Sequence, residues 1–368
     1  MKTIKNNKII IATGGTGGHI FPAYSLAKNF TKKDYLVEII TDKRGLKYLG
    51  KDNDIKLILN NSATIFKKSI INLFLSIFVI LFSYMKSLVI LYRAKPMVVF
   101  GMGGHASFPV CIAAKTLSIP FIVYENNIQI GKSNKYLLPF AFKIFVSYKD
   151  LIGIPKKQDH KVIVTGNIIR EEILNFKKKN QFLPQVLNIL VLGGSQAAKS
   201  FGELLPKVFE QCKKENINMK IFQQCIPSQT EKLSKIYKNL NYEFKLFTFT
   251  NNISEYFSKT ELAITRSGSS VTAELINCNI PFISIPYPHS ADSHQDKNAT
   301  YFEKKGYSHS VKETEVNTEL LPLIRSFYKN KQLLDEIIEK QKKHSDKDVF
   351  LIINKVIENL INEQNSNR

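Results

Sequence analysis

A histidine beside a run of glycines is the first feature of this sequence that could do chemistry. His19 follows Gly14-Gly15-Thr16-Gly17-Gly18, between the apolar run 8–12 and an apolar pattern of helical spacing that starts at Ile20. A strand, a glycine loop and a helix in this order present the N–H groups of the first helical turn to an anion. We therefore predict a site for a phosphate or a developing oxyanion, where the His19 imidazole can act as a base. A histidine that only caps the helix is the alternative.

The glycine spacing does not fit two common phosphate-binding loops. The dinucleotide fingerprint G-x-G-x-x-G needs a third glycine where Ile20 stands. A Walker A loop ends in Gly-Lys-Ser/Thr, and here His19 follows Gly18. Neither NAD nor ATP is favoured as the ligand.

A second loop of the same kind, Gly101-Met102-Gly103-Gly104-His105, follows the apolar run 98–100 and precedes another helical pattern. The predicted strand 120–124 ends in Glu125-Asn126-Asn127. Carboxyl ends of neighbouring parallel strands meet at one edge of a sheet, where open α/β sheets bind ligands. We expect these three segments to line one crevice.

The second half of the chain repeats the pattern. The predicted strand 188–192 opens on Gly193-Gly194-Ser195, and 262–265 is followed by the hydroxyl-rich segment 266–274. Backbone and hydroxyl donors suit a diphosphate, and the Glu274 carboxylate could bind the vicinal hydroxyls of a ribose. The alternative for Glu274 is a solvated carboxylate at a helix start.

A polar segment, 287–299, follows the predicted strand 281–286. Its His289, Asp292 and His294 are residue types that bind metals, but nothing in their spacing fixes a metal site. A sugar-binding or solvated loop is the favoured interpretation.

Composition indicates a globular protein of two domains. The chain has 368 residues, 44% hydrophobic and 23% charged, and four cysteines without a C-x-x-C pair, which indicates a reducing compartment. No signal peptide is recognisable, so a cytoplasmic protein is expected. The formal charge of +21 would attract nucleic acid, anionic membrane or phosphorylated substrates. Nucleic acid is the least favoured of these, because no nucleic-acid-binding motif stands out.

The run 70–85 is apolar on nearly every helical face, and Lys67, Lys68 and Lys86 flank it. Its sixteen residues fall short of the roughly 20 that span a bilayer. A helix lying in the membrane interface is one interpretation, since an ordinary covering helix has a polar face. A helix buried within the protein is the other.

Together these motifs resemble the MurG family, bacterial N-acetylglucosaminyltransferases that convert lipid I to lipid II in peptidoglycan synthesis, and so serve cell-wall biogenesis, shape and division. The resemblance covers nearly the whole chain and implies an α/β GT-B fold, with two Rossmann-like domains whose parallel sheets face each other across a cleft. It implies an acceptor- and membrane-binding domain over 1–166, a linker over 167–186, a UDP-GlcNAc-binding domain over 187–345, and a last helix, about 346–368, that packs back on the first domain.

The resemblance also implies an activity and its residues. GlcNAc would pass from UDP-GlcNAc to the MurNAc 4-hydroxyl of undecaprenyl-pyrophosphoryl-MurNAc-pentapeptide, lipid I, on the cytoplasmic face of the inner membrane, where the protein would be peripheral. Catalysis would rest on His19. Residues matching the family's UDP-GlcNAc contacts are Thr16, Gly17, Gly18, Asn127, Arg170, Ser195, Thr250, Ser269, Ser270, Val271, Thr272, Glu274 and Gln295. Gly103, Gly104, His105 and Asn298 are candidates for the acceptor or another role.

No Asp-x-Asp motif ends a predicted strand, so we expect inverting transfer without a metal or cofactor, in which helix amides and Arg170 stabilise the departing UDP. The chain departs from the family pattern at His105, usually tyrosine, at Glu125-Asn126-Asn127, usually Glu-Gln-Asn, and at Gln223-Gln224-Cys225-Ile226, usually His-Gln-Ser/Thr-Gly. The alternatives are another nucleotide-sugar enzyme of this fold, such as a UDP-GlcNAc 2-epimerase, and a non-catalytic basic module that binds membrane or nucleic acid.

Overall fold

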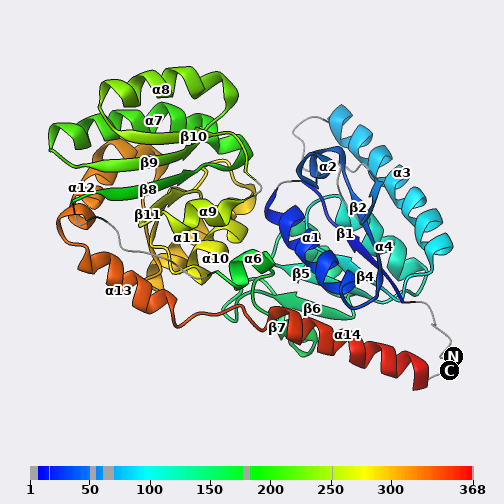
Figure 1. Ribbon diagram of the computed structural model, residues 1–368. Coiled ribbons are helices and arrows are strands. Elements are labelled where there is room, and N and C mark those ends of the chain that lie inside the picture. The colour runs from blue at the N-terminus through cyan, green and yellow to red at the C-terminus, as the bar shows by residue number, and fades with distance from the viewer. Residues whose placement is uncertain are drawn as a thin grey trace. The chain divides into compact units, whose positions relative to one another are not determined.

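The computed structural model describes residues 7–15, 17–49, 55–60, 70–176, 183, 185–250 and 252–366. The chain forms two compact units (Figure 1). Unit 1 comprises Met1–Arg170 and Asp346–Arg368, and unit 2 comprises Glu171–Ser345. Residues 167–170, assigned to a linker from the sequence, thus belong to unit 1.

Unit 1 is built on a parallel sheet of strand order β3-β2-β1-β4-β5-β6-β7. Its strands are apolar and largely buried, as parallel strands covered on both faces must be. The order reverses between β1 and β4, so the loops after these two strands leave the sheet at its topological switch point. The strands are β1 (Lys8–Ala12), β2 (Leu36–Thr41), β3 (Lys56–Leu59), β4 (Val98–Gly101), β5 (Phe121–Glu125), β6 (Lys143–Val146) and β7 (Val162–Val164).

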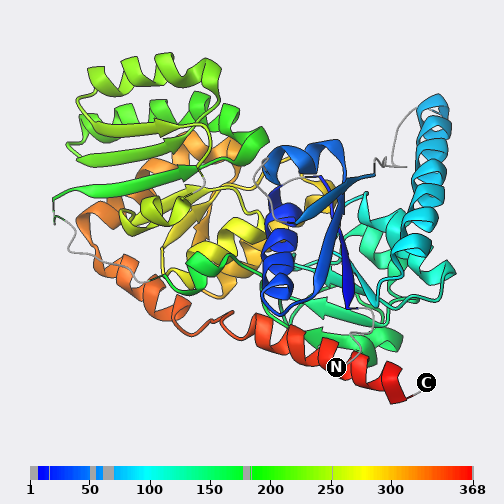
Figure 2. The same ribbon diagram turned by 45° about the vertical axis from the view of Figure 1, so that its right-hand side comes forward.

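Helices cover both faces of this sheet (Figures 1 and 2). Ile9 and Ile11 of β1 pack with α1 (Gly17–Thr31) and α14 (Val349–Ser366). Ile10 and Ala12 point to the other face, where they share a core with α3, α4 and α5. The remaining helical segments are α2 (Lys43–Leu49), α3 (Ile70–Ala94), α4 (Ser107–Thr116), α5 (Lys132–Leu137) and η1 (Lys156–Lys161).

The C-terminal helix α14 belongs to unit 1 through polar contacts as well as its apolar face. Asn29 Nδ2 donates to Asn354 Oδ1 over 2.9 Å. Just before α14, the buried Asp346 carboxylate accepts the Asn167 N–H over 2.8 Å and its side-chain amide over 3.2 Å. These hydrogen bonds therefore join the end of the first segment of unit 1, near Arg170, to the start of its second segment at Asp346.

Unit 2 repeats the architecture with strand order β10-β9-β8-β11-β12-β13, all parallel. Its switch point lies between β8 and β11. The strands are β8 (Leu187–Leu192), β9 (Met219–Gln224), β10 (Glu243–Phe247), β11 (Leu262–Thr265), β12 (Phe282–Ser284) and β13 (Ser308–Ser310). The helical segments are α6 (Glu171–Leu174), α7 (Gly194–Lys214), η2 (Pro227–Gln229), α8 (Thr230–Asn239), α9 (Ile253–Ser258), α10 (Ser269–Asn277), η3 (Ala291–Ser293), α11 (His294–Lys304), η4 (Glu313–Glu315), α12 (Val316–Lys329) and α13 (Gln332–Gln341).

The predicted α/β class with two Rossmann-like parallel sheets is confirmed. The helix predicted over 70–85 was too short, because α3 continues to Ala94. Lys86 does not end it: its side chain lies outside the core and its ammonium group donates to the Leu59 carbonyl over 2.7 Å. An exposed lysine on a helix is compatible with continued helix.

Candidate active site

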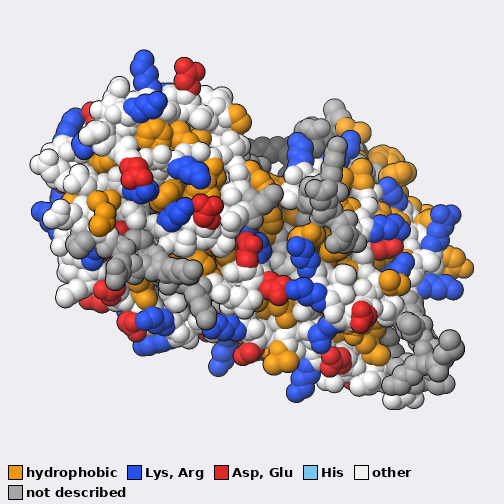
Figure 3. All heavy atoms as spheres, in the orientation of Figure 1, with side chains coloured by type: hydrophobic (Ala, Val, Ile, Leu, Met, Phe, Trp, Pro, Cys, Tyr) orange, Lys and Arg blue, Asp and Glu red, His pale blue; other side chains and the backbone are white. Residues whose placement is uncertain are grey.

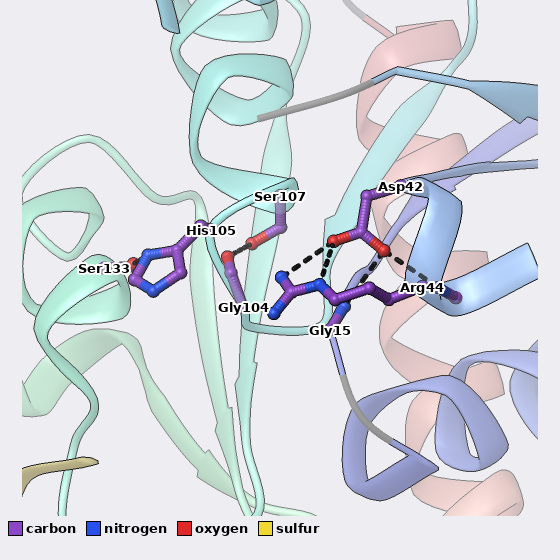
Figure 4. A network of polar contacts seen from close by, with 8 residues as sticks. Gly15, Asp42, Arg44, Gly104, His105, Ser107 and Ser133 are labelled. Atoms are coloured by element: carbon purple, nitrogen blue, oxygen red, sulfur yellow. Dashed lines mark hydrogen bonds and ion pairs between the residues drawn. The ribbon is translucent and has the colours of Figure 1, made fainter. Parts of the chain in front are cut away.

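The first glycine loop is held by an aspartate from the neighbouring strand. Asp42, directly after β2, accepts the N–H of Gly15 over 3.3 Å and that of Gly45 over 2.8 Å (Figure 4). Its second oxygen accepts two hydrogen bonds from the Arg44 guanidinium, over 2.8 and 3.1 Å. Burial raises the pKa of the Asp42 carboxyl, but the Gly45 amide, Arg44 and the Gly15 amide outweigh burial and hold the pKa below its ordinary value. Asp42 is therefore an anion that fixes the loop and Arg44 together.

The two glycine loops of unit 1 lie against each other. A Cβ on Gly104 would lie 2.7 Å from the Gly14 carbonyl oxygen, and a Cβ on Gly103 would lie 2.9 Å from Cε1 of His19. Both glycines have positive φ, +77° and +86°, so backbone conformation and close approach each require glycine here. The two loops, which the sequence predicts to line one crevice, thus contact each other, with His19 at the contact. Thr16 lies outside the described residues.

His105, where the family pattern has tyrosine, belongs to the second of these glycine loops. Its Nδ1 lies 3.5 Å from Ser133 Oγ, at the outer limit of a hydrogen bond (Figure 4). Burial and the Arg44 charge lower the pKa of His105, and Asp42 opposes them only partly. His105 is consequently a neutral imidazole at pH 7, able to donate at one nitrogen and accept at the other.

A third loop, after β5, completes this edge of unit 1. The buried Glu125 carboxylate accepts the N–H groups of Asn127 and Gly131 and the side-chain amides of Asn127 and Asn134, over 2.9 to 3.1 Å. Asn126 Nδ2 donates to the Gly18 carbonyl over 2.9 Å and so joins this loop to the first glycine loop. Asn127, a predicted UDP-GlcNAc contact, directs its amide nitrogen to Glu125 in this structure. Sequence reasoning did not assign Glu125, Asn126 or Asn134 these roles.

Arg170, the last residue of the first segment of unit 1, has its guanidinium 5.6 Å from the centre of the Phe21 ring. Phe21 lies on α1 close to Gly17, since a Cβ on Gly17 would come within 2.9 Å of that ring. Arg170, predicted as a UDP-GlcNAc contact, therefore places a positive charge near the start of α1.

In unit 2, Arg266 organises the carboxyl edge of the sheet. Its guanidinium donates to the Ile285 and Pro286 carbonyls over 3.0 and 3.1 Å and to Ser200 Oγ over 2.8 Å, and it pairs with Glu313. Burial lowers the pKa of Arg266 and Glu313 opposes that shift. This arginine ties the loop after β12 to α7 and η4.

The segment after Arg266 forms the first turns of α10, as expected for an anion site. Ser269, Ser270, Val271, Thr272 and Glu274 all lie on this helix. Thr272 Oγ1 donates to the Gly268 carbonyl over 2.9 Å, so its hydroxyl is hydrogen-bonded at the start of its own helix. Glu274 is only 6% exposed, which argues against the alternative of a solvated carboxylate.

The remaining predicted residues lie at the same edge of unit 2. Gln295 Oε1 accepts the Tyr287 N–H over 2.9 Å, and the buried Asn298 donates to the Ser267 carbonyl over 3.0 Å. Asn298 therefore links α11 to the loop after β11. Thr250 Oγ1 accepts the N–H of Asn252 over 3.1 Å, just before α9. Ser195 is in the first turn of α7, and its side chain lies outside the described part of the structure.

Sequence reasoning named Gln224, the last residue of β9, only as part of the segment 223–226 that departs from the family pattern, and gave it no role. Its Oε1 accepts the Gly194 N–H over 3.0 Å, and its Nε2 donates to the Thr248 carbonyl over 3.1 Å. The strand β9 itself was not predicted, so no pattern placed this side chain at the edge. Within the described residues, no group of three or more His, Cys, Asp or Glu side chains is arranged to hold a metal ion.

Comparison with known proteins agrees with this geometry. Residues 9–146 match the glycosyltransferase family 28 N-terminal domain, and residues 188–350 match the family 28 C-terminal domain. The chain is 33% identical over 362 residues to the UDP-N-acetylglucosamine–N-acetylmuramyl-(pentapeptide) pyrophosphoryl-undecaprenol N-acetylglucosamine transferase of Pelagibacter ubique (strain HTCC1062), covering 97% of this chain and 99% of that protein.

Solved structures share the fold. The crystal structure of Acinetobacter baumannii MurG superposes with a TM-score of 0.76 at 24% identity, over 96% of this chain and 99% of that one. A putative UDP-N-acetylglucosamine 2-epimerase from Listeria monocytogenes gives a TM-score of 0.67 at 14% identity, over 97% of each chain. Fold alone does not separate these two activities, whereas full-length identity above 30% does assign a family. The chain therefore belongs to the family of UDP-N-acetylglucosamine–N-acetylmuramyl-(pentapeptide) pyrophosphoryl-undecaprenol N-acetylglucosamine transferases and is a glycosyltransferase.

Proposed function

We propose that this enzyme transfers GlcNAc from UDP-GlcNAc to the MurNAc 4-hydroxyl of lipid I, giving lipid II and UDP. The observation that carries the proposal is the meeting of the two glycine loops of unit 1 around His19. Family membership and the switch-point loops of unit 2 support UDP-GlcNAc as the donor.

In the proposed reaction, the neutral His19 imidazole accepts the proton of the acceptor hydroxyl as its oxygen forms a bond to the anomeric carbon. The bond from that carbon to the UDP oxygen breaks, and the electron pair leaves with UDP. Attack opposite the leaving group inverts the configuration through an oxocarbenium-like transition state. An imidazole base contributes on the order of 10² to 10⁴ in rate.

The charge that gathers on UDP needs stabilisation. Amide groups at the starts of α7 and α10 in unit 2 provide it. The Glu274 carboxylate accepts hydrogen bonds from the ribose hydroxyls, and Thr250, Ser269, Ser270 and Gln295 supply further donor contacts. The Glu125 loop and Asp42 hold the unit 1 loops in place for the acceptor.

Helix α3 supports a peripheral position on an anionic membrane surface. Its buried positions include Ser76, Ser83 and Ser87 beside Leu91, while most of its exposed side chains are large and apolar, with the exposed Lys86 and Arg93 among them. This polarity is the reverse of that of a covering helix in a water-soluble protein. Hydrophobic side chains gather over α3 with Lys and Arg beside them (Figure 3); the exposed apolar residues are Leu75, Ile77, Phe78, Val79, Leu81, Phe82, Met85, Val89 and Tyr92.

By length and composition, α3 is also the one helix among the described residues that could cross a membrane, over Leu75–Ala94. Its polar face is engaged within unit 1, because Asn60 Nδ2 donates to Ser87 Oγ over 2.8 Å and to the Ser83 carbonyl over 3.1 Å. We therefore propose that α3 lies in the interface, apolar face toward lipid, on the cytoplasmic side of the inner membrane.

Incubation with radiolabelled UDP-GlcNAc and a lipid I analogue tests the proposal. We expect label in the lipid product and one UDP released for each sugar transferred. An epimerase would instead convert UDP-GlcNAc to its C2 epimer without acceptor, and a binding module would do neither. Either result would contradict the proposal.

A further inference from the structure

The side-chain amide of Gln224 joins two loops of unit 2. Gln224 ends β9, which lies between β8 and β10 in the sheet. Its Oε1 accepts the N–H of Gly194, after β8, and its Nε2 donates to the carbonyl of Thr248, after β10. One side chain thus connects the loops that leave the sheet on both sides of its own strand.

This double contact requires a group that both donates and accepts, as the side-chain amide of Gln224 does. A carboxylate of the same length accepts but cannot donate, and an ammonium group donates but cannot accept. The preceding glutamine has a different partner: the buried Gln223 accepts the Tyr237 hydroxyl of α8 over 2.5 Å. Gln223 therefore contacts a helix, α8, whereas Gln224 connects two loops at the edge of the sheet.

The joined loops are the ones proposed to hold the donor. Gly194 has φ of +67° and starts the 21-residue helix α7, whose first-turn amides suit a diphosphate. Thr248 lies two residues before Thr250. Neighbouring strands are about 4.8 Å apart, so the ends of β8 and β10 are separated by roughly 10 Å, a span that a nucleoside with its diphosphate covers.

We infer that Gln224 is a positioning residue that fixes the spacing between the Gly193–Ser195 loop and the Thr248–Thr250 loop for a nucleoside diphosphate. The inference rests on the proposed role of unit 2 as the UDP-GlcNAc-binding unit. Gln224 acts through the backbone of these loops, so its loss weakens the binding of UDP-GlcNAc and leaves the binding of the acceptor unchanged.

Gln224→Met tests this, because methionine keeps the length of the side chain and loses both hydrogen bonds. We expect the KM for UDP-GlcNAc to rise about 10-fold, equivalent to about 1.4 kcal/mol, with the KM for the lipid I analogue unchanged. The dissociation constant of UDP, measured by titration calorimetry, should rise by the same factor. Gly194→Ala, which strains a positive φ with no steric neighbour within 4 Å, should act in the same direction.

Gln229→Met is the matched control. Gln229 Nε2 donates to the Lys199 carbonyl over 2.9 Å, so this change removes a glutamine contact to α7 without touching either loop. Its KM values should equal those of the wild type. A wild-type KM for UDP-GlcNAc in Gln224→Met would overturn the inference, and so would a rise in both KM values with a lowered melting temperature. Failure of the wild type itself to bind UDP and transfer GlcNAc would count against the proposed function instead.

Discussion

The imidazole of His19 lies against the backbone of Gly103, so closely that a Cβ on Gly103 would be 2.9 Å from Cε1 and 3.0 Å from Nδ1. Two loops that are distant in the sequence thereby define the position of one side chain. The orientation of His19 depends on the absence of a side chain at Gly103.

Gly103→Ala should therefore displace His19 as well as strain a φ of +86°. We expect kcat to fall at least 10-fold, measured as UDP release at saturating UDP-GlcNAc. Gly153→Ala is the control, because Gly153 has φ of +99° and its Cβ would come within 2.7 Å of Ile130 rather than His19. It should lose comparable stability and retain kcat. Equal losses of kcat in both variants would refute the link to His19.

Substitutions of His19 and His105 should have different effects on the pH dependence of kcat/KM. A general base must be deprotonated to accept a proton, so kcat/KM should fall on the acidic limb of its pH profile. Burial and Arg44 lower the pKa of His105, so His105 takes up its proton at a lower pH than an ordinary histidine does. His105→Asn should keep the acidic limb where it is, and His19→Gln should abolish it. Loss of the limb in the His105 variant would reverse the assignment.

Asp42 should make stability depend on acid pH. Its folded-state pKa is lowered, so its contribution is complete above the unfolded pKa, about 3.9, and is lost as the pH falls through the folded value. Asp42→Asn should destabilise the protein by about 2 kcal/mol at pH 7, since charge-assisted hydrogen bonds to Gly15, Gly45 and Arg44 are weakened. Urea unfolding at pH 7 and pH 3 should show the difference between variant and wild type shrinking at pH 3. An undiminished difference would contradict the ionic role.

Membrane binding should depend on the outward face of α3. Phe78 and Phe82 are 68% and 72% exposed, and changing both to serine removes apolar area without altering the core. We expect the double variant to stop sedimenting with anionic phospholipid vesicles. Leu351→Ser on α14 is the control, since Leu351 is 68% exposed outside α3, and it should sediment as the wild type does. Continued sedimentation of the double variant would argue against the lipid-facing helix.

Patterns of apolar runs and glycines predicted the parts of the fold that have strong local signals. The runs at 8–12 and 262–265 coincide with β1 and β11, and the glycines after them mark the switch-point loops. The strand β9 was not predicted because its short apolar sequence is interrupted by Lys220 and ends in two glutamines. The edge strands of unit 2 were also missed: β10 carries Glu243 and Lys245, and β13 is the tripeptide Ser308–Ser310.

Contacts between distant residues could not be predicted from one sequence. Asp42 binds Gly15 across 27 positions, and Asn126 binds Gly18 across 108. Spacing places such residues at the end of a strand but does not show which side chains meet there. For that reason the glycines and His19 were recognised as a site, whereas the contacts made by Asp42, Glu125, Asn134 and Gln224 emerged only from the fold.

The most direct test is the rate of GlcNAc transfer to a lipid I analogue by His19→Ala, measured at saturating UDP-GlcNAc alongside the dissociation constant of UDP. A base at this position requires the rate to fall by on the order of 10² to 10⁴ while UDP binds as tightly as to the wild type. A transfer rate equal to that of the wild type would remove His19 from catalysis and contradict the proposed mechanism.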